Sequence, residues 1–124
     1  MEPIEYENAS EEVRALYDEI KAARGVPDVN NIWKYLAHHP ATARDVWEGL
    51  KQVMGPGELA PEVKELIYVA VSIANRCEYC VNTHSTAALK KGATPGMLNE
   101  MLAIVGMASK TNALAVGYQV PLDK

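Results

Sequence analysis

The residue types best suited to chemistry lie within eight positions, from Cys77 to His84. Cys77 and Cys80 are the only two cysteines of the chain, and His84 follows the second by four residues. On a helix, residues three and four positions apart share a face, so we expect the two thiols and the imidazole to lie together. Such a group can carry out redox chemistry or bind a metal ion.

Each thiol has a local reason to ionise. Cys77 is expected near the N-terminus of a helix, where exposed N–H groups and the helix dipole favour a thiolate. Cys80 has the imidazole of His84 one turn below it, which can accept the thiol proton and then, as a cation, hold the thiolate. The expected Cβ separation of the two cysteines, about 5–6 Å, permits a disulfide after local adjustment.

Glu65 precedes Cys77 by twelve residues on an apolar helix. We expect the chain to reverse near Arg76 into an antiparallel helical hairpin. Glu65 lies eleven residues before this reversal and His84 eight after it. Their heights then differ by about 4.5 Å of helix rise, which side chains can span. Because an unpaired buried charge is costly, we predict a line from Glu65 through His84 to Cys80, in which the carboxylate orients an imidazole that activates the thiol.

The elements that position these residues are all predicted to be helices. No segment alternates steadily between apolar and polar residues, and no Asn-Gly hairpin signal is present. Caps and helix breakers, such as Ser10, Gly25, Gly92 and Thr94-Pro95, predict helices at about 11–24, 31–38, 40–54, 61–75, 77–91 and 95–117. We therefore expect an all-α, single-domain bundle of about six helices over residues 1–124, with the Cys-x-x-Cys opening a helix that follows a buried central helix.

Composition excludes several classes of function. The chain has 124 residues, of which 48% are hydrophobic and 23% charged, as is usual for one globular domain. A net charge of −4 without a basic cluster argues against a nucleic-acid partner. The apolar run 66–74 is shorter than the roughly 20 residues that span a bilayer, and the N-terminus lacks the pattern of a secretory signal. We expect a cytoplasmic protein with no membrane partner, where a close cysteine pair is more often catalytic or metal-binding than structural.

The last predicted helix, about 95–117, combines small residues with large apolar ones. Small residues let helices approach closely, although glycine within a helix is unfavourable by up to about 1 kcal/mol relative to alanine. Tight packing within the chain and a subunit interface both account for this composition, and both remain open.

Five residues form a recognisable signature: Glu65, then Cys77-x-Tyr79-Cys80 after twelve residues, then His84. This pattern resembles the alkylhydroperoxidase AhpD-like family, within the carboxymuconolactone decarboxylase-like superfamily. Further similarity lies in His39-Pro40 with Trp47, in Gly55-Pro56-Gly57, in Lys91-Gly92-Ala93-Thr94 and in the Ala-rich last helix. The resemblance covers about residues 30–118 and leaves 1–29 as an N-terminal helix and lead-in.

The resemblance implies an all-helical protein that forms homo-oligomers, as trimers or hexamers, and reduces hydroperoxides. It assigns Cys80 as the peroxidatic cysteine, which becomes a sulfenic acid, and Cys77 as the resolving cysteine, which closes the disulfide. Glu65 and His84 match a proton relay, and Tyr79 stands where some members carry histidine. A dithiol or a lipoylated protein is the implied reductant, and we expect no cofactor.

Other functions fit parts of the same pattern. Cys77, Cys80 and His84, with Glu65, could ligate zinc, but the chain has no second ligand pair of the kind that structural zinc normally uses, so we expect no metal. General physics also favours Cys77 as nucleophile because of the helix end, whereas the imidazole favours Cys80, which we prefer. An oligomeric redox sensor or binding protein without turnover, an inert buried pair and a lactone decarboxylase-like enzyme are the remaining alternatives.

Overall fold

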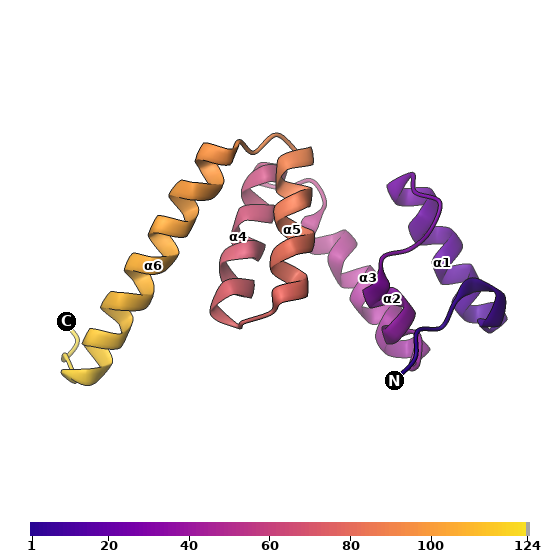
Figure 1. The fold of residues 1–124 in the computed structure, drawn as a ribbon, viewed down its shortest axis with the longest axis horizontal. Coiled ribbons are helices and arrows are strands. Elements are labelled where there is room, and N and C mark those ends of the chain that lie inside the picture. The colour runs from indigo at the N-terminus through magenta and orange to yellow at the C-terminus, as the bar shows by residue number, and fades with distance from the viewer. Residues whose placement is uncertain (124) are drawn as a thin grey trace. The chain divides into compact units, whose positions relative to one another are not determined.

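The computed structural model describes residues 1–123, and in that part of the chain all regular secondary structure is helical (Figure 1). The helices are η1 (Tyr6–Asn8), α1 (Glu11–Arg24), α2 (Asn31–Leu36), α3 (Pro40–Met54), α4 (Pro61–Ala74), α5 (Glu78–Lys90) and α6 (Pro95–Gly117). The prediction of an all-α fold with about six helices is confirmed, and the cysteine pair opens α5 as expected. The chain divides into two compact units, Met1–Gly55 and a second that begins at Pro56; the single-domain expectation stays a prediction.

The first unit packs α1, α2 and α3 around a cluster of buried apolar side chains. The rings of Trp33 and Trp47 meet edge to face within it, with centroids 5.7 Å apart. The ammonium group of Lys34 lies between the carboxylates of Glu5 and Asp28, at 2.9 and 2.8 Å. This lysine therefore ties the N-terminal segment and the loop before α2 to the rest of the unit.

Helix boundaries follow the predicted caps closely. The side chains of Ser10 and Thr94 each accept a hydrogen bond from the backbone N–H three residues on, and Gly25 ends α1 in the left-handed conformation. One cap was not predicted: Nδ1 of His39 accepts the backbone N–H of Thr42 at the start of α3. An imidazole can replace a Ser or Asp oxygen there because the cap requires only an acceptor.

The second unit is built on a hairpin in which α4 packs against α5, while α6 packs against α4. The reversal occupies Asn75–Cys77. Arg76 adopts a left-handed φ of 59°, and the N–H groups of Arg76 and Cys77 donate to the carbonyls of Ile73 and Ser72. This is the Schellman pattern of helix termination. It places Cys77 directly before the first residue of α5.

Much of the apolar surface of the second unit is uncovered. No residue of α6 is buried, and several of its large apolar side chains are about half exposed or more, among them Leu102, Ile104, Met107, Leu114 and Val116. On α4, Ile67 and Val71 are also about half exposed. Packing within a single chain thus leaves many apolar side chains of α6 uncovered. Within residues 1–123, no helix combines the length and apolar character needed to cross a membrane.

Candidate active site

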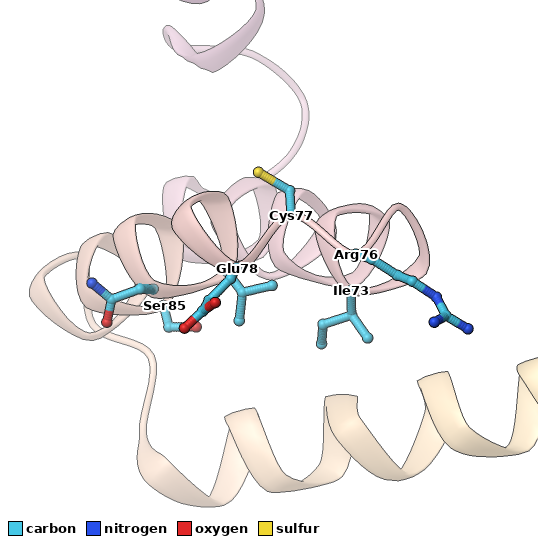
Figure 2. A pocket seen from close by; sticks show the side chains of 7 residues that line it. Ile73, Arg76, Cys77, Glu78 and Ser85 are labelled. Atoms are coloured by element: carbon cyan, nitrogen blue, oxygen red, sulfur yellow. The ribbon is translucent and has the colours of Figure 1, made fainter. Parts of the chain in front are cut away.

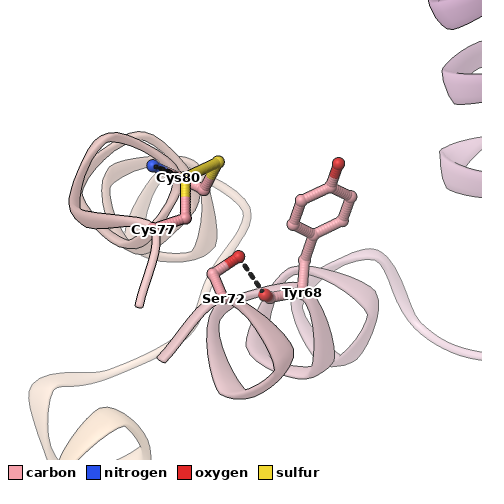
Figure 3. Close-up of a disulfide and its surroundings, with 4 residues drawn as sticks. All are labelled: Tyr68, Ser72, Cys77 and Cys80. Atoms are coloured by element: carbon pink, nitrogen blue, oxygen red, sulfur yellow. Dashed lines mark hydrogen bonds between the residues drawn. A yellow bond between two sulfur atoms is a disulfide. The ribbon is translucent and has the colours of Figure 1, made fainter. Parts of the chain in front are cut away.

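Cys77 and Cys80 are joined by a disulfide at the start of α5, with Cα atoms 5.3 Å apart (Figure 3). Cys77 has extended backbone angles and is the N-cap of the helix; its Sγ accepts a hydrogen bond from the backbone N–H of Cys80 at 3.3 Å. Once the disulfide is opened, a sulfur in this position is favoured as a thiolate, because the helix end supplies N–H donors and a positive dipole.

His84 lies on the same face of α5 as Cys80, one turn further along the helix. Its Nδ1 is 2.6 Å from Oε2 of Glu65, which projects from α4. The Glu65 side chain is 4% exposed and that of His84 is 18% exposed. When the carboxylate is ionised, Nδ1 donates its proton to it and Nε2 is left as the basic nitrogen of the ring. The structure thus brings together the carboxylate and the imidazole that the sequence places on separate helices.

Lys91 completes the surroundings of Glu65 and was not among the residues predicted from the sequence. Its Nζ lies 2.7 Å from Oε1 of Glu65, so that each carboxylate oxygen has its own partner. Lys91 is the C-cap of α5, and seven residues separate it from His84. Seven residues are close to two full turns, which returns the side chain to the same face. This seven-residue spacing is the sequence feature from which the position of Lys91 beside His84 could have been predicted.

Tyr68 was also missed. Its ring stacks on the imidazole of His84, with centroids 3.7 Å apart and planes inclined by 21°. Tyr68 lies three residues after Glu65, one turn along α4. The two residues that contact His84 from α4 therefore share one face of that helix. Figure 3 shows the Tyr68 ring and the disulfide projecting to the same side of the hairpin.

Ser72 connects the turn of α4 that carries Tyr68 to the first cysteine. Its hydroxyl donates to the carbonyl of Tyr68 at 2.7 Å, and its own carbonyl accepts the N–H of Cys77 at 2.9 Å. Ser72 is buried, with 5% of its surface exposed. The hydroxyl is satisfied by its own helix, which lets a polar residue face the packed side of α4 without an unpaired group.

Tyr79, the remaining predicted site residue, lies in the first turn of α5 and is 39% exposed. Adjacent helical residues point in different directions, so Tyr79 does not share the face on which Cys80 and His84 lie. Its catalytic role stays a prediction.

An open groove of about 570 Å³ lies at the turn end of the hairpin, and Figure 2 shows the side chains around it. Ile73, Arg76 and Glu78 point toward the groove, whereas the sulfur of Cys77 points the other way. The groove is lined by Ile73, Arg76, Cys77, Glu78, Val81, Asn82 and Ser85. The sulfur of Cys77 therefore does not project into this groove.

The side chains that could ligate a metal ion are engaged with one another. Among residues 1–123, no three His, Cys, Asp or Glu side chains gather in a way that could hold a metal ion. Cys77 and Cys80 are joined to each other, and the carboxylate of Glu65 is engaged by His84 and Lys91. In the disulfide state, these side chains bind one another rather than surround a common centre.

Known proteins match this chain over most of its length. A model of the carboxymuconolactone decarboxylase family matches residues 40–121. An uncharacterized protein of Cupriavidus necator is 35% identical over 78 residues, which are 62% of this chain and 69% of that protein. The crystal structure of the alkylhydroperoxidase AhpD core from Rhodospirillum rubrum is similar over 90% of this chain and 83% of that chain, with 50% identity and a TM-score of 0.86. The resemblance read from the cysteine signature is confirmed, and the chain belongs to the carboxymuconolactone decarboxylase family.

Proposed function

We propose that this protein is a thiol peroxidase that reduces organic or hydrogen peroxides through a Cys77–Cys80 dithiol/disulfide cycle. The observation that carries the proposal is the placement of His84, one turn from Cys80 and bonded through Nδ1 to buried Glu65. A nucleophile, a base and a group that orients the base form the general arrangement of an activated nucleophile. The similarity to the alkylhydroperoxidase AhpD core supports the same class of reaction.

The proposed cycle begins with both cysteines reduced. Nε2 of His84 accepts the proton of the Cys80 thiol, and the thiolate attacks one peroxide oxygen. The O–O bond breaks, Cys80 becomes a sulfenic acid, and the other oxygen leaves as an alcohol or water after taking the proton from His84. Cys77 then attacks the sulfenic sulfur, the S–O bond breaks, water leaves and the disulfide forms. Two electrons have passed from the two thiols to the peroxide.

An external dithiol closes the cycle, and we propose a small dithiol or a lipoylated protein for this step. Its thiolate attacks one sulfur of the disulfide, and the other sulfur leaves. Cys77 is suited to be the leaving thiolate because its Sγ already accepts the N–H of Cys80 at the helix end. The reductant is then oxidised to a disulfide and both protein cysteines are reduced. A role of Tyr79 in proton transfer is supported only by the resemblance to the family.

A redox sensor without turnover is the second candidate, because a reversible Cys77–Cys80 disulfide is all that a sensor needs. Steady-state consumption of hydrogen peroxide and cumene hydroperoxide, with dithiothreitol or dihydrolipoamide as reductant, separates the two. A peroxidase consumes many equivalents of peroxide per chain, and Cys80→Ser abolishes this consumption. Consumption that stops after one equivalent while reductant is still present contradicts the peroxidase and supports the sensor.

We also propose that the protein acts as a homo-oligomer, a trimer or hexamer, in the cytoplasm. The uncovered apolar side chains of α6 support self-association, because monomeric proteins rarely expose large contiguous apolar patches. A reducing compartment supports the cycle because it maintains the pool of dithiols that returns the cysteines to the reduced form.

A further inference from the structure

The carboxylate of Glu65 has two partners of different character. Its Oε2 is 2.6 Å from Nδ1 of His84, which carries a charge only when it is protonated, and its Oε1 is 2.7 Å from the ammonium of Lys91. The Glu65 side chain is 4% exposed, whereas that of Lys91 is 38% exposed. A carboxylate as buried as this keeps its negative charge only when nearby donors or cations compensate for lost hydration. Lys91 supplies such a cation whether or not His84 is protonated.

A cation beside a carboxylate affects how strongly a neighbouring imidazole holds its proton. Without Lys91, a protonated imidazole of His84 would have to supply the positive charge that compensates Glu65. The ring would then keep its proton up to a higher pH. An imidazole that is already protonated cannot accept the thiol proton of Cys80. Lys91 compensates the carboxylate without requiring a proton on the imidazole.

We propose that Lys91 is a positioning residue that acts through Glu65 to keep His84 unprotonated, and thereby sets the pH range in which the site can activate its thiol. The catalytic consequence rests on the proposed peroxidase function, but the effect on His84 does not. Lys91 is well placed for this because it is the C-cap of α5, in a turn that Gly92 closes with a left-handed φ of 109°. Its backbone is fixed by hydrogen bonds to the last turn of that helix.

Other charged or titratable residues lie on the helices that pack around Glu65 and His84. The further charged or titratable residues of these helices are Glu62, Lys64 and Tyr68 on α4, Glu78, Tyr79 and Lys90 on α5 with Cys77 and Cys80 at its start, and Glu100 and Lys110 on α6. Tyr68 contacts the ring face of His84 rather than its nitrogens, and the two disulfide-bonded cysteines do not titrate. The ion pairs of Glu65 are with His84 and Lys91.

The test is made on the oxidised protein, in which the cysteines do not titrate and no turnover occurs. The ring signals of His84 are followed by NMR against pH and assigned by comparison with His84→Gln, because the chain also contains two other histidines. In Lys91→Met, the titration midpoint of His84 is expected to move to higher pH by about one unit, as for loss of a cation that contacts the pair. Lys91→Arg keeps the charge and is expected to titrate like the wild type. Lys90→Met, at the neighbouring exposed lysine, is the matched control.

A midpoint that stays in place or moves to lower pH in Lys91→Met overturns the proposal. If this variant does not fold, Lys91→Gln carries the same expectation with a polar side chain, and an unchanged midpoint there is equally decisive. In the reduced protein, the acid limb of the pH–rate profile for thiol oxidation is expected to move by the same amount in Lys91→Met. Absence of peroxide consumption in the wild type would contradict the proposed function and leave the titration result standing.

Discussion

The backbone N–H of Cys80 donates a hydrogen bond to Sγ of Cys77, so that one cysteine caps the helix that carries the other. The two sulfurs therefore differ in what stabilises their thiolates. Cys77 is stabilised by the helix end, whereas Cys80 has an imidazole one turn away whose orientation is fixed from α4. This difference underlies the assignment of Cys80 as the sulfur that attacks and Cys77 as the sulfur that resolves.

Replacing Glu65 by Gln tests the carboxylate that orients His84. The amide keeps the size of the side chain but not its charge, so the imidazole is no longer held as a base and thiol oxidation by peroxide at pH 7 should slow by about tenfold or more. Stopped-flow mixing of reduced protein with excess peroxide measures this rate. Glu62→Gln, one turn earlier on α4, is the control and should react like the wild type. An unaltered rate in Glu65→Gln would remove the carboxylate from the mechanism.

Tyr68 offers a test of the stacked contact on the imidazole. Tyr68→Phe keeps the ring and should leave thiol oxidation nearly unchanged, whereas Tyr68→Leu removes the ring and should slow oxidation by about two- to tenfold, the equivalent of one aromatic pair. The ring-current shift of the His84 signals in NMR checks the contact itself, because it should persist in the Phe variant and disappear in the Leu variant. A rate loss in Tyr68→Phe equal to that in Tyr68→Leu would assign the role to the hydroxyl instead.

The contact between Glu65 and His84 could be anticipated from the sequence because two simple quantities determine it. The first is the position of the hairpin reversal near Arg76, which the end of an apolar helix marks. The second is the distance along each helix: Glu65 lies eleven residues before the reversal and His84 eight after it, so their side chains come within reach of each other. Helix ends were equally predictable, because caps such as Ser10 and Thr94 act through neighbouring backbone groups.

Lys91 and Tyr68 were missed for a physical reason. A lysine in the last turn of a helix already has a sufficient explanation in the helix dipole, and an aromatic residue on an apolar helix has one in core packing. Their actual partners depend on the rotation of α4 and α5 about their axes, which local sequence determines poorly. The cap formed by His39 was missed because imidazole is an uncommon acceptor at helix starts.

Lys34 should make a pH-dependent contribution to the stability of the first unit. Its hydrogen bond holds the pKa of the Asp28 carboxyl below the usual range, while partial burial opposes this shift. A lowered folded-state pKa gives stability that is present above the unfolded value, near pH 3.9, and is lost as the pH falls through the folded value. Because Asp28 and Glu5 are well exposed, solvent screens both ion pairs, and Lys34→Met should lower the free energy of unfolding by only about 0.5 kcal/mol at pH 7 and by less at pH 3.

Urea unfolding followed by tryptophan fluorescence checks the Lys34 prediction, since Trp33 and Trp47 both lie in the core of that unit. Lys110→Met, at an exposed position of α6, is the control for loss of a surface charge. A deficit in Lys34→Met that is as large at pH 3 as at pH 7 would show that the ion pairs are not its source.

The exposed apolar side chains of α6 predict self-association that a single charge can weaken. Ile104 is 63% exposed in the single chain, so Ile104→Lys should not unfold it, but a lysine buried in a subunit interface would be unfavourable. Light scattering should give the wild type a mass that is a multiple of 13.6 kDa and shift Ile104→Lys toward the monomer. Asn112→Lys, at another exposed position of the helix, tests whether any added charge has this effect. A monomeric wild type would contradict the proposed oligomer.

The site of sulfenic acid formation tests the central claim most directly. Reduced Cys77→Ser and Cys80→Ser proteins are each treated with peroxide in the presence of dimedone, and the adduct is located by mass spectrometry. Attack by the sulfur next to His84 predicts an adduct on Cys80 in the Cys77→Ser protein and none in the Cys80→Ser protein. An adduct on Cys77 in Cys80→Ser, together with an unmodified Cys80 in Cys77→Ser, would contradict the account.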